Sequence, residues 1–211
     1  MHKLIHVTQV MNWKEKALDI LEDSLYPVAV ELNELDWKSG LSCKTERLAQ
    51  HLCAFSNLKG GGILFFGVND DATFSSMTKE ACDDIIKKLG NIAKNNLSSS
   101  ISVEHWTTDY KGHALLFIHI SEQMDKPIHL RGKEIWDSYT RSAGQTVKSE
   151  MTKQEKIEAC YQHACLVYED NRAINNQSVR ERFGIDKNQS SVASRIIADT
   201  LESKKSYPMK I

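Results

Sequence analysis

Polar and apolar positions along the first 170 residues change their spacing several times, and each spacing is typical of one kind of element. Apolar residues recur every three or four positions in segments 12–26, 78–97 and 152–169, and in a segment that begins at Thr45, whose side chain can cap the first turn. We expect these four segments to be amphipathic helices. Residues 57–62 end in three glycines and predict a tight turn after the second helix.

The other apolar runs have the alternating or continuous pattern of strands, which we expect at residues 28–38, 62–68, 100–110, 113–120, 128–130 and 134–141. The run GILFFGV is apolar throughout, which predicts a central strand covered on both faces. Residues 111–112 are expected to turn one hairpin and residues 131–133 another. The order of elements predicts an α+β fold, with a mixed or antiparallel sheet and flanking helices, rather than an alternating parallel sheet.

The pattern changes after residue 170. SVRERFGI and SSVASRIIADTLES predict two short helices joined by a turn at residues 184–188, the layout of a helix-turn-helix. We therefore expect one domain over residues 1–170 and a small helix-turn-helix segment over residues 171–211. That segment holds eight of the 27 Lys and Arg residues but four of the 28 Asp and Glu residues. Such a basic tail is suited to a polyanion, although an ordinary solvated surface explains the charge equally well.

The composition is that of a soluble globular protein. The longest apolar runs are far shorter than the roughly 20 residues of a membrane-spanning helix, and MHKLIHVTQVMNWKEK lacks the pattern of a signal peptide. We expect a cytoplasmic protein with no membrane contact. Five irregularly spaced cysteines argue against a disulfide framework. Cys160, His163 and Cys165 share one predicted helix without a second ligand pair, so no zinc site is expected, and the scattered histidines, including His51, are interpreted as structural.

One strand pattern, VELNELDWKSG at residues 30–40, carries three acidic residues and Lys38. Strand side chains five positions apart point to opposite faces, so Glu31 and Asp36 converge only if the chain bends between them. Asp70 follows the central strand and can approach the acidic strand if the two pair. Three carboxylates gathered in this way could hold Mg²⁺ or Mn²⁺ and activate water against a phosphodiester, with Lys38 facing the phosphate. Solvated surface charge is the alternative interpretation.

An ordered series of motifs runs through the first domain, namely Glu31, Asp36 and Lys38, then Ala54–Asn57, Gly61–Gly62 and GVND, which ends at Asp70. A later run, PIHLRGKEIWDSYTRSAG, contains Pro127, Tyr139 and Arg141. Together, over roughly residues 12–158, the series resembles the Schlafen AlbA-like domain, whose pattern opens with Glu, four residues, Glu, any residue and Lys. The later run resembles the closing hairpin of that family. The resemblance implies the same α+β fold.

The resemblance implies two functions. Bacterial and archaeal members are usually described as DNA-binding, transcription-regulator modules, so we expect first a nucleic-acid-binding protein whose partner is DNA or RNA. Vertebrate members with the same core are metal-dependent endoribonucleases that act on transfer and ribosomal RNA. The alternative is therefore an endoribonuclease that uses Glu31, Asp36 and Asp70 as metal ligands for Mg²⁺ or Mn²⁺, with Lys38 beside them. Because the vertebrate core holds two such lobes and this chain has one, a homodimer is also expected.

The tail resembles the winged helix that follows this domain in many bacterial members, through SVRERFGIDKN and SRIIADTLE. The resemblance implies a recognition helix over residues 190–201, in which Ser194 and Arg195 face nucleic acid, while Arg180 and Arg182 contact phosphates. Nucleic acid is also expected at Arg141 in the closing hairpin. The rival interpretation is that these helices cap the first domain. The family usually continues into a wing, whereas this sequence ends in KKSYPMKI. We therefore expect either a partial winged helix or a fragment of a longer protein.

Overall fold

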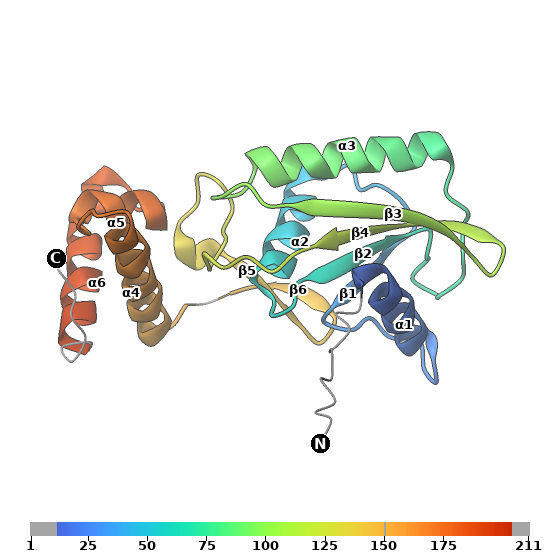
Figure 1. The fold of residues 1–211 in the computed structure, drawn as a ribbon, viewed down its shortest axis with the longest axis horizontal. Helices are drawn as coiled ribbons and strands as arrows, with labels where there is room; N and C mark the ends of the chain where they lie inside the picture. Colours follow the sequence, from blue (N-terminus) through green and yellow to red (C-terminus); the bar gives the residue numbers. More distant parts are fainter. Residues whose placement is uncertain (1–11, 150, 204–211) are drawn as a thin grey trace, which may run out of the picture.

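The computed structural model describes residues 12–149 and 151–203 (Figure 1). Its centre is a four-stranded sheet in the order β1-β2-β4-β3, formed by β1 Leu35–Lys38, β2 Gly62–Phe66, β4 His113–Ile120 and β3 Val103–Tyr110. Strand β1 pairs with β2 in parallel, and the other two pairings are antiparallel. The mixed sheet confirms the predicted α+β class, and β2 is the central strand that its continuous apolar run predicts.

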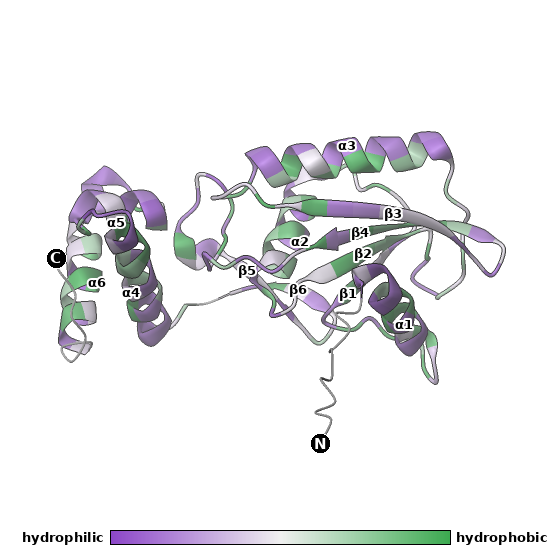
Figure 2. Ribbon diagram, viewed as in Figure 1, coloured by the Kyte–Doolittle hydropathy of each residue, from purple (hydrophilic) through white to green (hydrophobic). Residues whose placement is uncertain are grey.

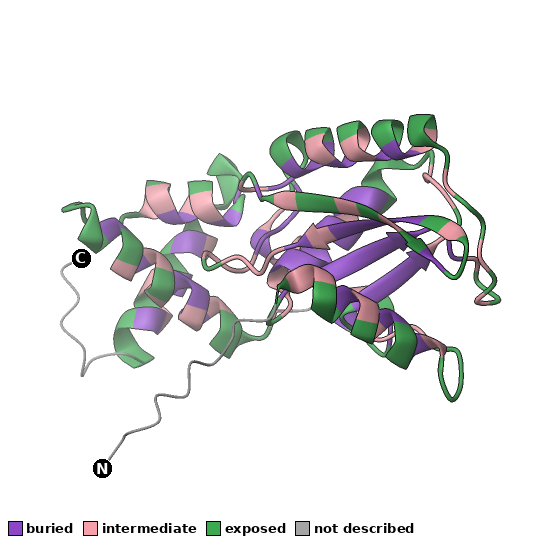
Figure 3. Ribbon diagram, turned by 45° about the vertical axis from the view of Figure 1, so that its right-hand side comes forward, coloured by how far each residue is buried: buried purple, intermediate pink, exposed green. Residues whose placement is uncertain are grey.

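Helices cover both faces of this sheet. They are α1 Trp13–Leu25, α2 Thr45–Asn57 and α3 Lys79–Asn95. Because successive strand side chains point to opposite faces, Leu64 and Phe66 pack against α2 and α3, whereas Ile63 and Phe65 pack towards α1. Figure 3 shows the buried strands between the partly exposed helices. The sheet is therefore the middle layer of three, as the apolar pattern of β2 requires.

Of the two predicted N-caps, the one at the start of α3 is confirmed and the one at the start of α2 is not. Thr78 caps α3, since its hydroxyl accepts a hydrogen bond from Ala81 N at 3.2 Å. The predicted cap at Thr45 is wrong, because Lys44 occupies that position without a side-chain bond and Thr45 is the first helical residue. The glycine turn after α2 is confirmed. Gly61 has φ +75°, and a Cβ there would lie 2.2 Å from the carbonyl oxygen of Ile120.

Two strand predictions need correction. The first strand does not extend over residues 28–38 but begins at Leu35, because its register with β2 starts at the pair of Leu35 and Ile63. The N–H of Ile63 donates to Glu34 O at 2.8 Å at this end of the pairing. The second predicted hairpin is reduced to one bridge, His129 with Ser138, since residues 135–137 form a short 3₁₀ turn. A different hairpin follows, in which β5 Tyr139–Ser142 pairs with β6 Gln145–Lys148.

The last three helices are α4 Lys153–Glu169, α5 Asn176–Phe183 and α6 Ser190–Ser203, close to their predicted bounds. They share one apolar cluster with Ile135 of the 3₁₀ turn, built from Ala159, Cys160, Ala164, Ile174, Val179, Phe183, Ile185, Ala193 and Ile196. Helix α5 ends at Gly184, which has φ +66° and begins the turn to α6. The predicted helix-turn-helix arrangement of α5 and α6 is thus present.

The three-helix cluster touches the sheet part of the protein through α5. Arg182 Nη2 lies 2.9 Å from Asp125 Oδ1, and His129 Nε2 lies 3.3 Å from the carbonyl oxygen of Arg182. The division into two domains near residue 171 stays a prediction. In the structure, that position lies between α4 and α5, which share the same core. Residues 204–211, KKSYPMKI, lie outside the described residues, as do residues 1–11 of the segment compared with a signal peptide.

No helix in the described ranges is long and apolar enough to cross a membrane. All five cysteines are free thiols, as their irregular spacing predicts.

Candidate functional site

A cavity of about 640 Å³ lies beside Asp36, and we call it the Asp36 cavity. Its walls come from the loop before β1, β1 itself, the first turns of α2, the turn between β5 and β6, and the loop after β2. The four residues that the sequence predicts for chemistry, Glu31, Asp36, Lys38 and Asp70, all line it. Segments far apart in the sequence therefore meet at one edge of the sheet.

A bend before β1 brings Glu31 to the same cavity as Asp36. Because the strand begins only at Leu35, Glu31 lies in a loop. Its side chain therefore does not have to follow the alternation of side chains between the two faces of a strand. Its Oε1 accepts a hydrogen bond from the backbone N–H of Trp37 at 2.7 Å. This bond folds the loop back along the strand. The convergence that strand geometry forbids is thus achieved by the shorter strand.

Asp36 is buried, with 3% of its surface exposed, among three basic side chains. Lys38 Nζ lies 2.6 Å and His51 Nδ1 lies 3.2 Å from its Oδ2, and Arg141 Nη1 lies 3.5 Å from its Oδ1. The contacts to Oδ2 are ion-pair distances without the angles of hydrogen bonds, so this buried oxygen has no hydrogen-bond donor among the described residues. Asp36 and Lys38 share a face because they are two positions apart in β1.

Burial and neighbouring charges shift the pKa values of Glu31, Asp36 and His51. Burial alone would raise the pKa of Asp36, but positive charge on His51, Lys38 and Arg141 outweighs burial and lowers it. Burial lowers the pKa of His51 to about 4, so at neutral pH the cations that balance Asp36 are Lys38 and Arg141. Burial, followed by the nearby charge of Asp36, raises the pKa of Glu31 to about 7. Glu31 is therefore only partly ionised at neutral pH.

Arg141 lies inside the site and not on a surface that nucleic acid could reach. Its side chain is fully buried, and its Nη2 donates to the carbonyl oxygens of Leu35 at 2.7 Å and Gly144 at 2.5 Å. Nη1 donates to Thr146 Oγ1 at 3.0 Å. The guanidinium thus joins the β5–β6 turn to the loop before β1 and faces Asp36. Its fork of donors suits this task, which a lysine could not perform.

The sequence did not point to Thr146 or Gly144 as parts of the site. Thr146 Oγ1 lies 2.9 Å from His51 Nδ1, so it connects the hairpin to α2. Gly144 has φ +75°, and a Cβ there would lie 2.4 Å from the carbonyl oxygen of Glu31. Nothing local in the sequence marks either contact, because both partners are more than 90 residues away. His51 is buried and makes these internal contacts, which agrees with the structural role expected for it.

The carboxylates share the cavity but do not form a ready metal site. Among the residues that the structure describes, no group of three or more His, Cys, Asp and Glu side chains lies close enough together to hold a metal ion. Asp70 is exposed at the rim, and Asp36 is already neutralised by Lys38 and Arg141. Oδ2 of Asp36 is one oxygen of the right kind, but it already faces Lys38, and a divalent cation needs several oxygen ligands. In this arrangement the residues do not fit Mg²⁺ or Mn²⁺.

The predicted nucleic-acid contacts of the tail lie in different environments. Arg182 is engaged with Asp125, and its side chain is 11% exposed. Arg180 is half-buried, and its Nε donates to Asn176 Oδ1 at 2.9 Å. Ser194 and Arg195 are exposed on α6. The structure thus leaves Ser194 and Arg195 at the surface and ties the other two arginines into the protein.

A protein-family model described as "Schlafen, AlbA_2" matches residues 31–150, which is more than half of the 211-residue chain. The chain belongs to this Schlafen AlbA_2 family. This match confirms the resemblance to the Schlafen AlbA-like domain that was inferred from the sequence motifs. The family match spans the cavity residues from Glu31 to Thr146, whereas α5 and α6 lie beyond it.

Two solved structures are similar to this Schlafen AlbA_2 chain. The crystal structure of the DIP2311 protein from Corynebacterium diphtheriae is 16% identical over 72% of this chain, with a TM-score of 0.45. This chain spans 29% of the length of that protein. The solution structure of the N-terminal domain of a RecG-related protein from Nitrosomonas europaea is 19% identical, with a TM-score of 0.41, over 64% of this chain and 89% of that one. Among curated proteins, none matches this chain.

Proposed function

We propose that this Schlafen AlbA_2 protein binds nucleic acid as a DNA-binding, regulatory type of module, and that α6 is its reading helix. The observation that carries the proposal is the exposed face of α6. Successive turns of the helix present small and polar side chains there, namely Ser190, Ser191, Ser194, Arg195 and Ala198. A helix with small side chains on one face fits into a major groove about 12 Å wide.

The position of α6 supports this role. Its apolar side, which includes Ala193 and Ile196, packs against α4 and α5, and α6 lies at the end of the molecule away from the sheet (Figure 1). Asn176 fixes the angle between α5 and α6, since its Nδ2 donates to Ser190 O at 2.8 Å and to Ser194 Oγ at 2.9 Å. The reading face is therefore held rigidly by its own motif.

The alternative function, a metal-dependent endoribonuclease at the Asp36 cavity, is favoured by one observation. Glu31, Asp36, Asp70 and Lys38 come from separate segments and still line one cavity. Against it stands the arrangement described above, in which Asp36 is balanced by cations of the protein and Asp70 stays at the rim. Metal ligation would require Asp70 to move inwards and Lys38 to leave Asp36, so we rank this function second.

Binding is tested with labelled duplex DNA and labelled transfer RNA by fluorescence anisotropy over a range of salt concentrations. Reversing one exposed charge on the reading face, Arg195→Glu, should weaken binding at low salt. It should also reduce the slope of log K against log salt concentration by about one. The matched control is Lys79→Glu, which reverses an exposed charge at the start of α3, far from α6. If Arg195→Glu binds as tightly as the parent, α6 is not the reading helix.

The same samples separate the two functions. Incubation of transfer RNA with Mn²⁺ or EDTA tests cleavage, and Asp70→Asn removes one carboxylate charge at an exposed position without disturbing the core. Binding without metal-dependent cleavage is the expected result. Cleavage that requires Mn²⁺ and is lost in Asp70→Asn would replace the proposal with the endoribonuclease. Absence of binding to both nucleic acids would refute both functions.

A further inference from the structure

The loop between α1 and β1 presents five consecutive apolar residues, Tyr26–Val30, to solvent. Tyr26 is 65% exposed, Val28 is 71% exposed and Val30 is 53% exposed, which makes them three of the seven exposed large apolar residues among those the structure describes. In Figure 2 only part of this loop, beyond the end of α1, has the green colour of hydrophobic residues. Folding gains nothing from apolar surface that stays in water, so a contiguous patch of this kind indicates a binding surface.

Hydrogen bonds hold the loop in one shape. The backbone N–H of Tyr26 donates to Glu22 O at 3.1 Å, which ends α1, and the N–H of Val30 donates to Ser24 O at 2.8 Å, which closes the loop. Ser24 is itself buried and donates its hydroxyl to Leu21 O. The loop is thus anchored at both ends, and the side chains of Tyr26 and Val28 project from an anchored backbone.

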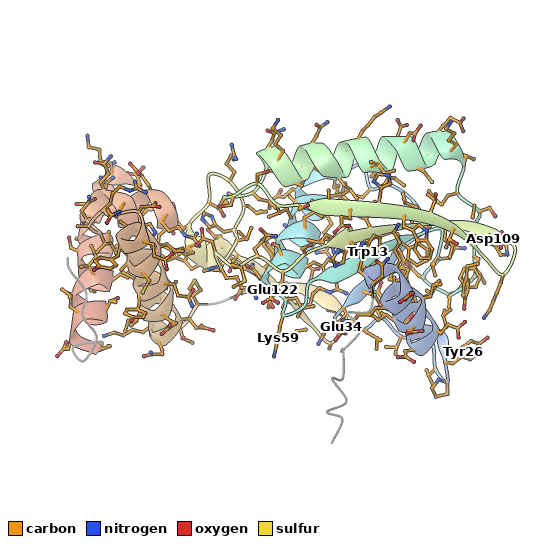
Figure 4. The ribbon with its side chains drawn as sticks, viewed as in Figure 1. Trp13, Tyr26, Glu34, Lys59, Asp109 and Glu122 are labelled. Atoms are coloured by element: carbon orange, nitrogen blue, oxygen red, sulfur yellow. The ribbon has the colours of Figure 1, made fainter. Side chains whose placement is uncertain are left out.

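A lysine from a distant turn stands beside the tyrosine ring. Lys111, in the turn between β3 and β4, places its Nζ 5.3 Å from the centroid of the Tyr26 ring and 4.8 Å from that of Tyr110. Tyr110 in turn donates its hydroxyl to Glu22 Oε1 at 3.0 Å. Figure 4 shows Tyr26 and Asp109, which precedes this turn, at the same end of the molecule. The ammonium group of Lys111 therefore lies over one face of the exposed Tyr26 ring.

The loop also borders the Asp36 cavity. Ala29 and Val30 form part of its wall, and Lys38 and Arg47 lie on the same cavity. We call Tyr26–Val30 together with Lys111 the Tyr26 platform. Lys111 is thus the cation of the platform itself. The cavity adds little net positive charge, because its cations Lys38, Arg47 and Arg141 share it with the acids Glu31, Asp36 and Asp70.

We propose that the Tyr26 platform binds an unpaired base of single-stranded nucleic acid, with the base stacked on Tyr26 and a neighbouring phosphate at Lys111. Stacking on exposed aromatic rings next to cations is how proteins hold single strands without reading their sequence. The ligand class rests on the proposed function. The site is separate from α6, which lies at the opposite end of the molecule (Figure 1). The protein would accordingly hold a single strand at one end and a duplex at the other.

A nucleic-acid ligand suits the platform better than a protein partner does. A stable protein interface uses about 20–30 residues on each side, whereas the platform has the five loop residues and one lysine. The ammonium group of Lys111 would also be poorly matched to an apolar protein surface. The competing occupant is a protein, either a second copy of this chain or another partner, that docks through Val28. The experiment must distinguish this protein contact from the stacking of a base.

The test measures the affinity of the full chain for a labelled single-stranded oligoadenylate and for the same strand in a duplex. Tyr26→Ala should weaken single-strand binding by roughly 5- to 150-fold, the range that base stacking supplies, and should leave duplex binding unchanged. Tyr26→Trp should retain single-strand binding, whereas Tyr26→Leu, which stays apolar but has no ring, should lose it. Tyr168→Ala is the matched control, since Tyr168 on α4 is 58% exposed and lies in another part of the fold.

The outcomes distinguish this inference from the proposed function. Unchanged single-strand affinity in Tyr26→Ala, with duplex binding intact in the parent, would refute the platform and leave α6 as the reading helix. If the parent binds no nucleic acid of either form, the proposed function fails and the inference fails with it. If Tyr26→Leu behaves like the parent while Val28→Ser converts a dimer to a monomer in light scattering, the platform is a protein contact and not a base-stacking site.

Discussion

Replacing Arg141 by methionine should destabilise the protein severely. The substitution keeps a long side chain but removes the donors that bond the carbonyl oxygens of Leu35 and Gly144, and it removes one of two cations facing buried Asp36 at neutral pH. Removing one partner of a buried ion pair costs about 3–5 kcal/mol, and each carbonyl left without a donor adds about 1 kcal/mol. Because Lys38 remains beside Asp36, we take about 2 kcal/mol for the ion pair, below the range for a charge left alone. With about 2 kcal/mol for the two carbonyls, the total is about 4 kcal/mol, a large part of the roughly 5–15 kcal/mol that holds a domain together.

Urea denaturation followed by tryptophan fluorescence measures this change, which corresponds to a fall of about 2 M in the midpoint. Arg47→Met is the matched control, because Arg47 is exposed at the same cavity and its loss should change the unfolding free energy by less than about 0.5 kcal/mol. Adding Asp36→Asn to Arg141→Met should recover part of the loss, since the buried charge is then gone. An Arg141→Met protein within about 1 kcal/mol of the parent would refute the reasoning that this guanidinium holds the site together.

Two further changes test the same region. Glu31→Gln should stabilise the protein more at about pH 8 than at about pH 5. Folding raises the pKa of Glu31 from 4.5 to about 7. The stability that the neutral carboxyl contributes below pH 4.5 is therefore lost as the pH rises through 7, whereas glutamine stays neutral at both pH values. Urea midpoints at the two pH values check this, and an equal effect at both would contradict it. Gly144→Ala should lower the free energy of unfolding by about 2–3 kcal/mol. Gly132→Ala should cost less, because Gly132 has the same φ of +75° but open space where its Cβ would lie. Equal losses in thermal unfolding would count against the close approach of Gly144 to Glu31.

Much of the fold could be predicted from local sequence. The helices, the central strand and the β3–β4 hairpin follow from the spacing of apolar residues, because that spacing decides which backbone geometry can bury them on one face. The candidate acids were also found from sequence, since their residue types and order match the family pattern. These predictions depend on neighbours in the chain or on a motif, and both are visible without a structure.

Tertiary structure decided how those residues meet. The bend that places Glu31 beside Asp36 is possible because the register of β1 with β2 starts only at Leu35, a limit set by the partner strand. Arg141 was predicted to contact nucleic acid, but it is buried because Asp36 and carbonyl oxygens from two distant segments surround it. The exposure of the Tyr26 loop is likewise invisible in its sequence, since Tyr26 falls at the end of a predicted helix and residues 28–30 at the start of a predicted strand. Burial, charge balance and exposure depend on contacts between segments far apart, and for that reason the spacing of residues along the chain could not supply them.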